Sequence, residues 1–95
     1  GGNSIRCAPY ETFGTRKLSK VVLTALEGRL ACLMANHGML AIGVDIDKAF
    51  NTALLVEDLC RQYIFSNIIG DPLLISEIEM RRVSEKFKLY GVQDV

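Results

Sequence analysis

The chain has 95 residues, of which 49% are hydrophobic and 23% are charged, a balance typical of one small folded domain and not of a disordered chain. Its 11 basic and 11 acidic residues cancel to a formal net charge of zero, which favours neither a nucleic-acid-binding surface nor a charged membrane-surface protein. The apolar runs are far shorter than the roughly 20 residues that span a bilayer. Hydrophobicity is high for so short a domain, which indicates a partner surface or a further part of the protein.

The first thirty residues predict a short strand followed by a helix. Residues 5–8 are typical of a strand that Pro9 ends. Thr15 is a predicted N-cap, because its hydroxyl can accept a hydrogen bond from an amide of the first helical turn. Gly28 should end this helix. The apolar residues between them recur at helical spacing: Leu18, Val21, Val22, Ala25 and Leu26.

Two short apolar runs, residues 30–35 and 39–44, predict two buried strands. Each is too short for a helix of usual length and is bounded by turn residues. Asn36 to Gly38 would connect them, so we expect a tight antiparallel hairpin.

A long helix is predicted next, capped by Asp45 or Asp47 and running to about Ile68. Gly70-Asp71-Pro72 should break it, because proline cannot continue a helix.

Ser76 and Glu79 form a capping-box pattern that predicts a last helix, which we expect to stop near Tyr90-Gly91. This order of elements predicts an α/β layered fold. Two or three strands make a poor sheet alone, so we expect the remaining strands to lie upstream of Gly1.

The three cysteines, Cys7, Cys32 and Cys60, are odd in number, widely spaced and without a CxxC pair. This pattern favours neither a disulfide framework nor a thiolate metal site. We expect buried free thiols in a reducing cytoplasm.

His37 is the only histidine. A lone histidine between strands is more often structural than a metal ligand, and catalytic zinc needs three protein ligands. No cysteine or carboxylate stands at ligand spacing from His37. Any metal there must therefore take its other ligands from outside this chain.

Three stretches resemble the class II sugar-phosphate aldolases. They are residues 7–15 (CAPYETFGT), residues 35–41 (ANHGMLA) followed by Asp47-Lys48-Ala49, and residues 86–91 (KFKLYG). Their order and spacing agree with that family throughout, and the ending resembles its fuculose-phosphate branch. The resemblance covers essentially the whole chain, so residues 1–95 would be the C-terminal part of a single aldolase domain of three α/β/α layers.

The resemblance implies a zinc-dependent enzyme that cleaves L-fuculose 1-phosphate to dihydroxyacetone phosphate and L-lactaldehyde. It implies that His37 is one zinc ligand, that Tyr90 is a catalytic tyrosine, and that Phe13 and Phe87 lie near the aldehyde end of the substrate. The other zinc ligands and a catalytic glutamate would lie in the preceding half. It also implies a cytoplasmic homotetramer with active sites between subunits.

Two alternatives stay open at this point. Pentulose-phosphate epimerases and thioribulose-phosphate dehydratases share the zinc histidines but differ in their acid-base residues, which would lie outside this chain. A non-catalytic interaction module of the cytoskeletal branch would have the fold without the site. The presence of His37 and Tyr90 favours an enzyme.

Overall fold

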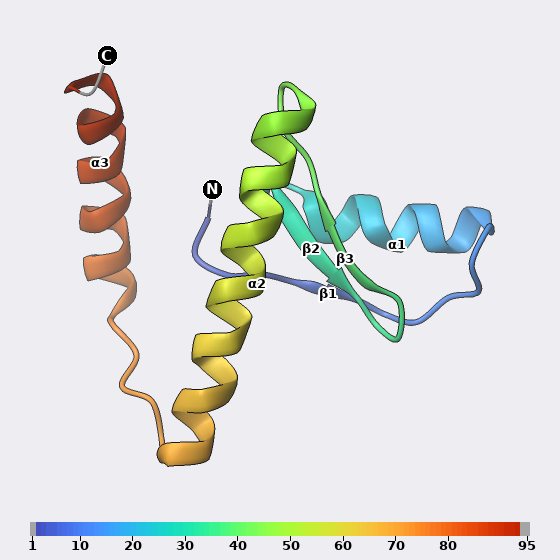
Figure 1. The fold of residues 1–95 in the computed structure, drawn as a ribbon, viewed down its shortest axis with the longest axis horizontal. Helices are drawn as coiled ribbons and strands as arrows, with labels where there is room; N and C mark the ends of the chain where they lie inside the picture. The colour runs from blue at the N-terminus through green and yellow to red at the C-terminus, as the bar shows by residue number, and fades with distance from the viewer. Residues whose placement is uncertain (1, 94–95) are drawn as a thin grey trace.

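The computed structural model describes residues 2–93, with side chains as far as residue 89 (Figure 1). The elements follow in the order β1 (Cys7–Ala8), α1 (Arg16–Leu26), β2 (Ala31–Met34), β3 (Gly38–Ala41), α2 (Ile46–Ile69) and α3 (Glu77–Gln93). Strand and helix types agree with the sequence prediction, and the strands are shorter than the apolar runs that predicted them.

The strands form one sheet in the order β1-β2-β3. β2 and β3 pair antiparallel as the expected hairpin, with Cys32 opposite Leu40. β1 pairs parallel with β2 on its other side, with Ala8 opposite Met34. The hairpin turn is closed by the His37 N–H, which donates to the Met34 carbonyl oxygen at 3.0 Å.

Helices cover both faces of this sheet, which gives the layered arrangement that the sequence predicts (Figure 1). α1 packs on β1 and β2, and the core between them includes Ala8, Val22, Ala25 and the fully buried Cys32. α2 packs on β2 and β3. Because successive residues of a strand face opposite sides, Ala31 points away from Cys32, to the α2 side, and is also buried.

Each helix begins at the residue that its sequence predicts. Thr15, Asp45 and Ser76 each accept a hydrogen bond from the backbone amide three residues later, at 3.2, 2.8 and 3.1 Å. Of the two candidate caps for α2, Asp45 is the cap and Asp47 lies in the first turn, where its charge favours the positive end of the helix dipole.

The helix ends agree less well with the prediction. Gly28 follows α1 with a φ of 64°, a left-handed conformation that glycine adopts without a Cβ clash, as expected. The predicted stop of the last helix at Tyr90-Gly91 is wrong, because α3 continues to Gln93. A glycine inside a helix costs only about 1 kcal/mol relative to alanine, which is too little to end it without a further breaker.

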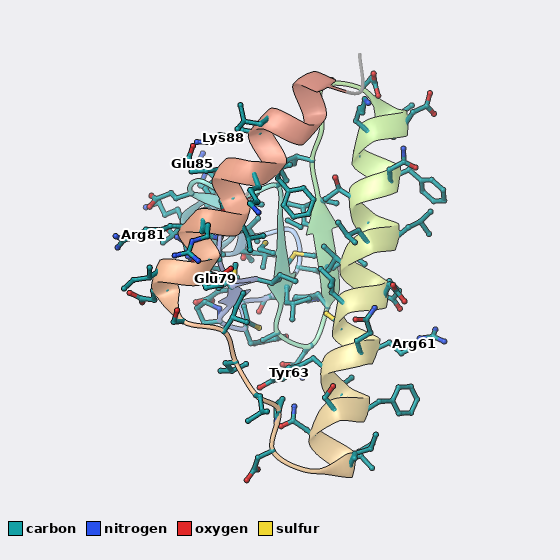
Figure 2. The ribbon with its side chains drawn as sticks, turned by 90° about the vertical axis from the view of Figure 1, so that its left-hand side faces the viewer. Arg61, Tyr63, Glu79, Arg81, Glu85 and Lys88 are labelled. Atoms are coloured by element: carbon teal, nitrogen blue, oxygen red, sulfur yellow. The ribbon has the colours of Figure 1, made fainter. Side chains whose placement is uncertain are left out.

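After α2 the chain turns back, and α3 stands apart from the sheet on the opposite side of α2 from α1 (Figure 1). Within residues 2–93, α3 packs against no other helix or strand. Its charged side carries two exposed ion pairs. Glu79 pairs with Arg82 at 3.1 Å. Glu85 pairs with Lys88 at 3.3 Å (Figure 2). Large apolar side chains stay exposed along α2 and the following loop, among them Ile64, Phe65, Ile68, Ile69, Leu73 and Leu74. Exposure of this extent is typical of a surface that another part of a protein covers.

No helix in the described part of the chain is long and apolar enough to cross a membrane.

Candidate functional site

His37 lies in the turn between β2 and β3, and its side chain is exposed. Its Nε2 atom lies 2.8 Å from the carbonyl oxygen of Glu11. A carbonyl oxygen only accepts, so Nε2 carries the proton in this contact. In the neutral ring, Nδ1 then holds the free lone pair that a metal ion would need.

Tyr10 stacks on the same imidazole, with ring centroids 5.4 Å apart and ring planes inclined by 15°. Tyr10 and Glu11 follow β1, and the pairing of β1 with β2 brings them to the hairpin turn. The bond from the Ala35 N–H to the Ala8 carbonyl oxygen, 3.0 Å long, fixes this approach. His37 is therefore held from two directions by consecutive residues.

The sequence assigns no site role to Tyr10 or Glu11, which appear there only within the stretch of residues 7–15 that resembles the aldolases. Glu11 acts through its main-chain carbonyl, which every residue type carries, so no side-chain pattern could have identified it. Tyr10 offers one weak signal in the sequence, because it is an aromatic residue directly after Pro9, which ends β1. β1 pairs with β2, the strand that leads to His37.

The other predicted site residues make no hydrogen bond or ring stack with His37 within the residues whose side chains the structure describes. Phe13 lies in the loop before α1 and is 79% exposed. Phe87 lies on α3 and is 67% exposed. Figure 1 shows α3 on the opposite side of the molecule from the β2–β3 turn. Tyr90 belongs to the α3 backbone, and its side chain lies outside the described residues.

One metal ligand is what these residues can offer. Residues 2–93 contain no group of three or more His, Cys, Asp or Glu side chains able to hold a metal ion. An exposed neutral imidazole with a free lone pair suits zinc as one ligand of several. His37 is therefore one candidate ligand, and the origin of any further ligands stays a prediction.

The cysteines are free, as predicted, but only partly buried. Cys32 is buried, Cys60 is intermediate and Cys7 is exposed, so the expectation of burial is wrong for Cys7. Cys7 lies on an edge strand that α1 covers on one face only, and it points to the other face. Burial raises the pKa of the Cys32 thiol, and the nearby Cys7 raises it further.

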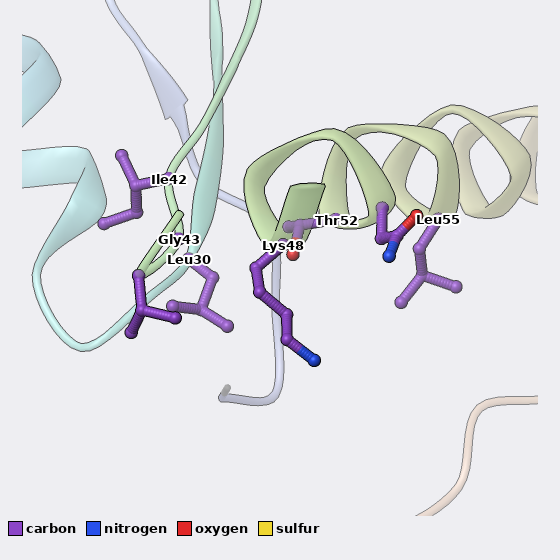
Figure 3. A pocket seen from close by; sticks show the side chains of 8 residues that line it. Leu30, Ile42, Gly43, Lys48, Thr52 and Leu55 are labelled. Carbon is purple, nitrogen blue, oxygen red and sulfur yellow. The ribbon is translucent and has the colours of Figure 1, made fainter. Parts of the chain in front are cut away.

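Two shallow hollows flank the start of α2, and neither includes His37. One, of about 420 Å³, has apolar walls from Leu30, Ile42 and Leu55, with Lys48 and Thr52 as polar groups (Figure 3). The second, of about 380 Å³, lies around Phe50 between α2 and β3. Their linings bring together no set of acid-base or metal-ligating groups, so the His37 turn is the better candidate site.

Comparisons with known proteins agree with the fold and with the resemblance. The family model for the class II aldolase and adducin N-terminal domain matches residues 1–64. A solved structure of L-fuculose 1-phosphate aldolase superposes with a TM-score of 0.83 at 39% identity, covering 88% of this chain and 40% of that one. This likeness confirms the α/β fold class.

Curated relatives carry several substrate names. The chain is 50% identical over 91 residues to the 5-methylthioribulose-1-phosphate/5-deoxyribulose-1-phosphate aldolase of Rhodospirillum rubrum, covering 96% of this chain and 41% of the relative. It is 48% identical over 94 residues to the L-fuculose phosphate aldolase of Escherichia coli K12, covering 98% and 44%. It is 41% identical over 92 residues to the 5-deoxy-D-ribulose 1-phosphate aldolase of Bacillus thuringiensis, covering 97% and 43%.

The chain thus spans less than half the length of these relatives. The family-model match over residues 1–64 covers most of the chain, and the fold agrees with it. The chain therefore belongs to the class II aldolase and adducin family.

Proposed function

We propose that the complete protein is a class II aldolase that cleaves a ketose 1-phosphate, with L-fuculose 1-phosphate as the first candidate substrate. The products would be dihydroxyacetone phosphate and L-lactaldehyde. The observation that carries this proposal is the match of nearly the whole chain to proteins named as aldolases of such substrates. Residues 1–95 would form the C-terminal part of one aldolase domain.

The names of these relatives share a chemical feature beyond the phosphate. Fuculose, 5-deoxyribulose and 5-methylthioribulose all lack a hydroxyl on the carbon farthest from the phosphate. The aldehyde released from each therefore ends in an apolar group. Phe13 and Phe87 are aromatic and exposed in this chain, and such rings suit an apolar substrate end. We propose that both contact it in the complete assembly.

We propose zinc as the metal and His37 as one of its ligands, the others lying outside this chain. When bound, the metal would act as a Lewis acid that withdraws electrons from substrate oxygens. His37 would present a neutral ring nitrogen, held by Tyr10 and Glu11. Tyr90 would donate a hydrogen bond to the aldehyde oxygen, where negative charge develops when the carbon–carbon bond forms.

We also propose a homotetramer with active sites between subunits, located in the cytoplasm. The apolar residues exposed on α2, such as Phe65 and Ile68, support extensive contacts with other parts of the assembly. The free thiols Cys7, Cys32 and Cys60 suit a reducing compartment. Light scattering on the complete protein would give the subunit number.

The test is an assay of the complete zinc-loaded protein for dihydroxyacetone phosphate release. We expect release from L-fuculose 1-phosphate, and we would compare 5-deoxyribulose 1-phosphate and 5-methylthioribulose 1-phosphate in parallel. Faster release from one of the pentulose phosphates would identify that compound as the better substrate and would leave the proposed aldolase activity in place. A zinc-bound protein that releases the product from none of them would disprove the aldolase.

The same reactions separate the alternatives. Conversion of a pentulose phosphate to its epimer, without cleavage, would indicate an epimerase, and loss of water would indicate a dehydratase. A protein that binds no metal would favour the non-catalytic module. His37→Asn is the matched control, since it keeps a polar side chain of similar size in the turn and should lose zinc and cleavage together.

A further inference from the structure

We propose that Tyr10 is a positioning residue for the metal ligand His37. This inference rests on the proposed metal role of His37 and extends it to a residue outside the ligand set. The carrying observation is the stack of the two rings, 5.4 Å between centroids and 15° between planes.

An exposed histidine in a turn has two free side-chain torsions, and a metal must order both when it binds. Two contacts already order this ring. The bond from Nε2 to the Glu11 carbonyl oxygen, 2.8 Å long, fixes the direction of one ring edge. The Tyr10 face fixes the ring plane. The hydrogen bond alone would leave the imidazole ring free to rotate about the line that joins Nε2 to the Glu11 oxygen. The stack with Tyr10 restricts that rotation, so the two contacts are complementary.

The two contacts come from a backbone that is itself fixed. β1 is joined to β2 by the Leu33 N–H to Arg6 carbonyl bond at 2.8 Å and by the Ala35 N–H to Ala8 carbonyl bond at 3.0 Å. Tyr10 therefore lies two residues after the end of β1, a strand in the same sheet as the two strands that His37 connects. A rigid support of this kind reduces the conformational entropy that the His37 side chain would lose when it binds a metal.

The stack uses the ring face of Tyr10, and this determines which substitutions should matter. Tyr10→Phe keeps the ring and should bind zinc within about twofold of the parent protein. Tyr10→Leu keeps apolar bulk but loses the flat face, and Tyr10→Ala loses both. We expect about tenfold weaker zinc binding for these two, the lower end of what groups that orient metal ligands contribute.

The experiment measures zinc affinity of the complete protein by competition with a chromogenic chelator, and records the visible spectrum of the Co²⁺-loaded form. Tyr63→Ala, an exposed tyrosine on α2, is the matched control and should leave both unchanged. Tyr10→Ala and Tyr10→Leu should shift the Co²⁺ bands, which a change in overall stability alone would not do. Melting temperatures of all variants would identify any that fail to fold.

Equal zinc affinity in the parent, Tyr10→Leu and Tyr10→Phe proteins would overturn the positioning role while leaving His37 as a ligand. A parent protein that binds neither zinc nor Co²⁺ would instead overturn the metal site itself, and with it the proposed function. The two failures are therefore distinguishable in one set of measurements.

Discussion

Arg6 holds the C-terminal end of α1, where its Nη1 donates a hydrogen bond to the carbonyl oxygen of Glu27 at 2.7 Å. The same nitrogen lies 3.3 Å from the carbonyl oxygen of Ala25. The last carbonyls of a helix lack partners within the helix and carry its partial negative charge. The guanidinium therefore satisfies acceptors and neutralises charge at once, and it ties the segment before β1 to the end of α1.

Replacing Arg6 by methionine should lower the free energy of unfolding by about 1–2 kcal/mol, because the carbonyls lose a charged donor that is only partly exposed. Urea titration followed by circular dichroism would measure the change. Arg61→Met is the control, since Arg61 is exposed on α2 and points away from the sheet (Figure 2). Equal effects of the two substitutions would contradict the capping role.

The Arg6 contact also shows which parts of this fold a sequence can predict. Thr15, Asp45 and Ser76 act on amides three residues away, so their capping roles follow from local pattern. The hairpin follows equally from apolar runs and turn residues. Arg6 reaches a residue 21 positions along the chain, and no local pattern encodes that distance.

The candidate site also has one part that a local sequence pattern predicts and another that depends on contacts between distant segments. His37 can be found from its residue type and the motif around it, but the Glu11 carbonyl and the Tyr10 stack arise only when β1 pairs beside the hairpin. The helix that carries Phe87 packs on no other helix or strand within residues 2–93. No packing of α3 on the sheet or on α1 and α2, within those residues, therefore indicates a site for Phe87, and its role stays a prediction.

Gly43 allows the chain after β3 to pass close to the start of α2. A Cβ built at this position would lie 2.6 Å from the Ala49 backbone nitrogen, closer than real Cβ atoms approach backbone. Gly43→Ala should therefore destabilise the protein by about 1–3 kcal/mol, the usual cost of overpacking. Thermal unfolding followed by calorimetry would show it as a lower melting temperature.

Gly70→Ala provides the matched comparison for that substitution. A Cβ at Gly70 would meet nothing within 4 Å, and its φ of 171° is extended backbone that any residue adopts. We expect no loss of stability, and a gain of up to about 0.5 kcal/mol from the stiffer unfolded chain. A melting temperature for Gly43→Ala as high as that for Gly70→Ala would contradict the prediction, because it would show that the backbone near Ala49 moves with no loss of stability.

The raised pKa of Cys32 predicts that stability falls at alkaline pH. Below the usual thiol pKa of 9.0 the group is protonated in both states, so its contribution to stability is complete. Above 9.0 the unfolded chain loses the proton that the buried thiol keeps, and unfolding becomes easier until the folded pKa is reached. Urea midpoints measured between about pH 7 and 10.5 should decline more steeply for the parent than for Cys32→Ala.

The same burial should separate the thiols by reactivity. Iodoacetamide should modify the exposed Cys7 of the folded protein well before the buried Cys32, because only the accessible thiolate attacks. Mass spectrometry of digested samples would give both rates. In the urea experiment, Cys7→Ser is the control. Its midpoint should still fall at alkaline pH, since desolvation of Cys32 is the largest cause of the raised pKa. Similar alkylation rates at Cys7 and Cys32 would contradict the buried environment.

Tyr90 offers a test of the proposed catalytic chemistry that is separate from metal binding. Tyr90→Phe removes only the hydroxyl, so turnover should fall about a hundredfold, as for loss of a positioned proton donor. Zinc content should stay nearly unchanged, since the proposed ligand is His37. Removal of residues 90–95 should have the same two effects. Steady-state kinetics and metal analysis on the same preparations would measure both, and loss of zinc on either change would contradict a role confined to the substrate.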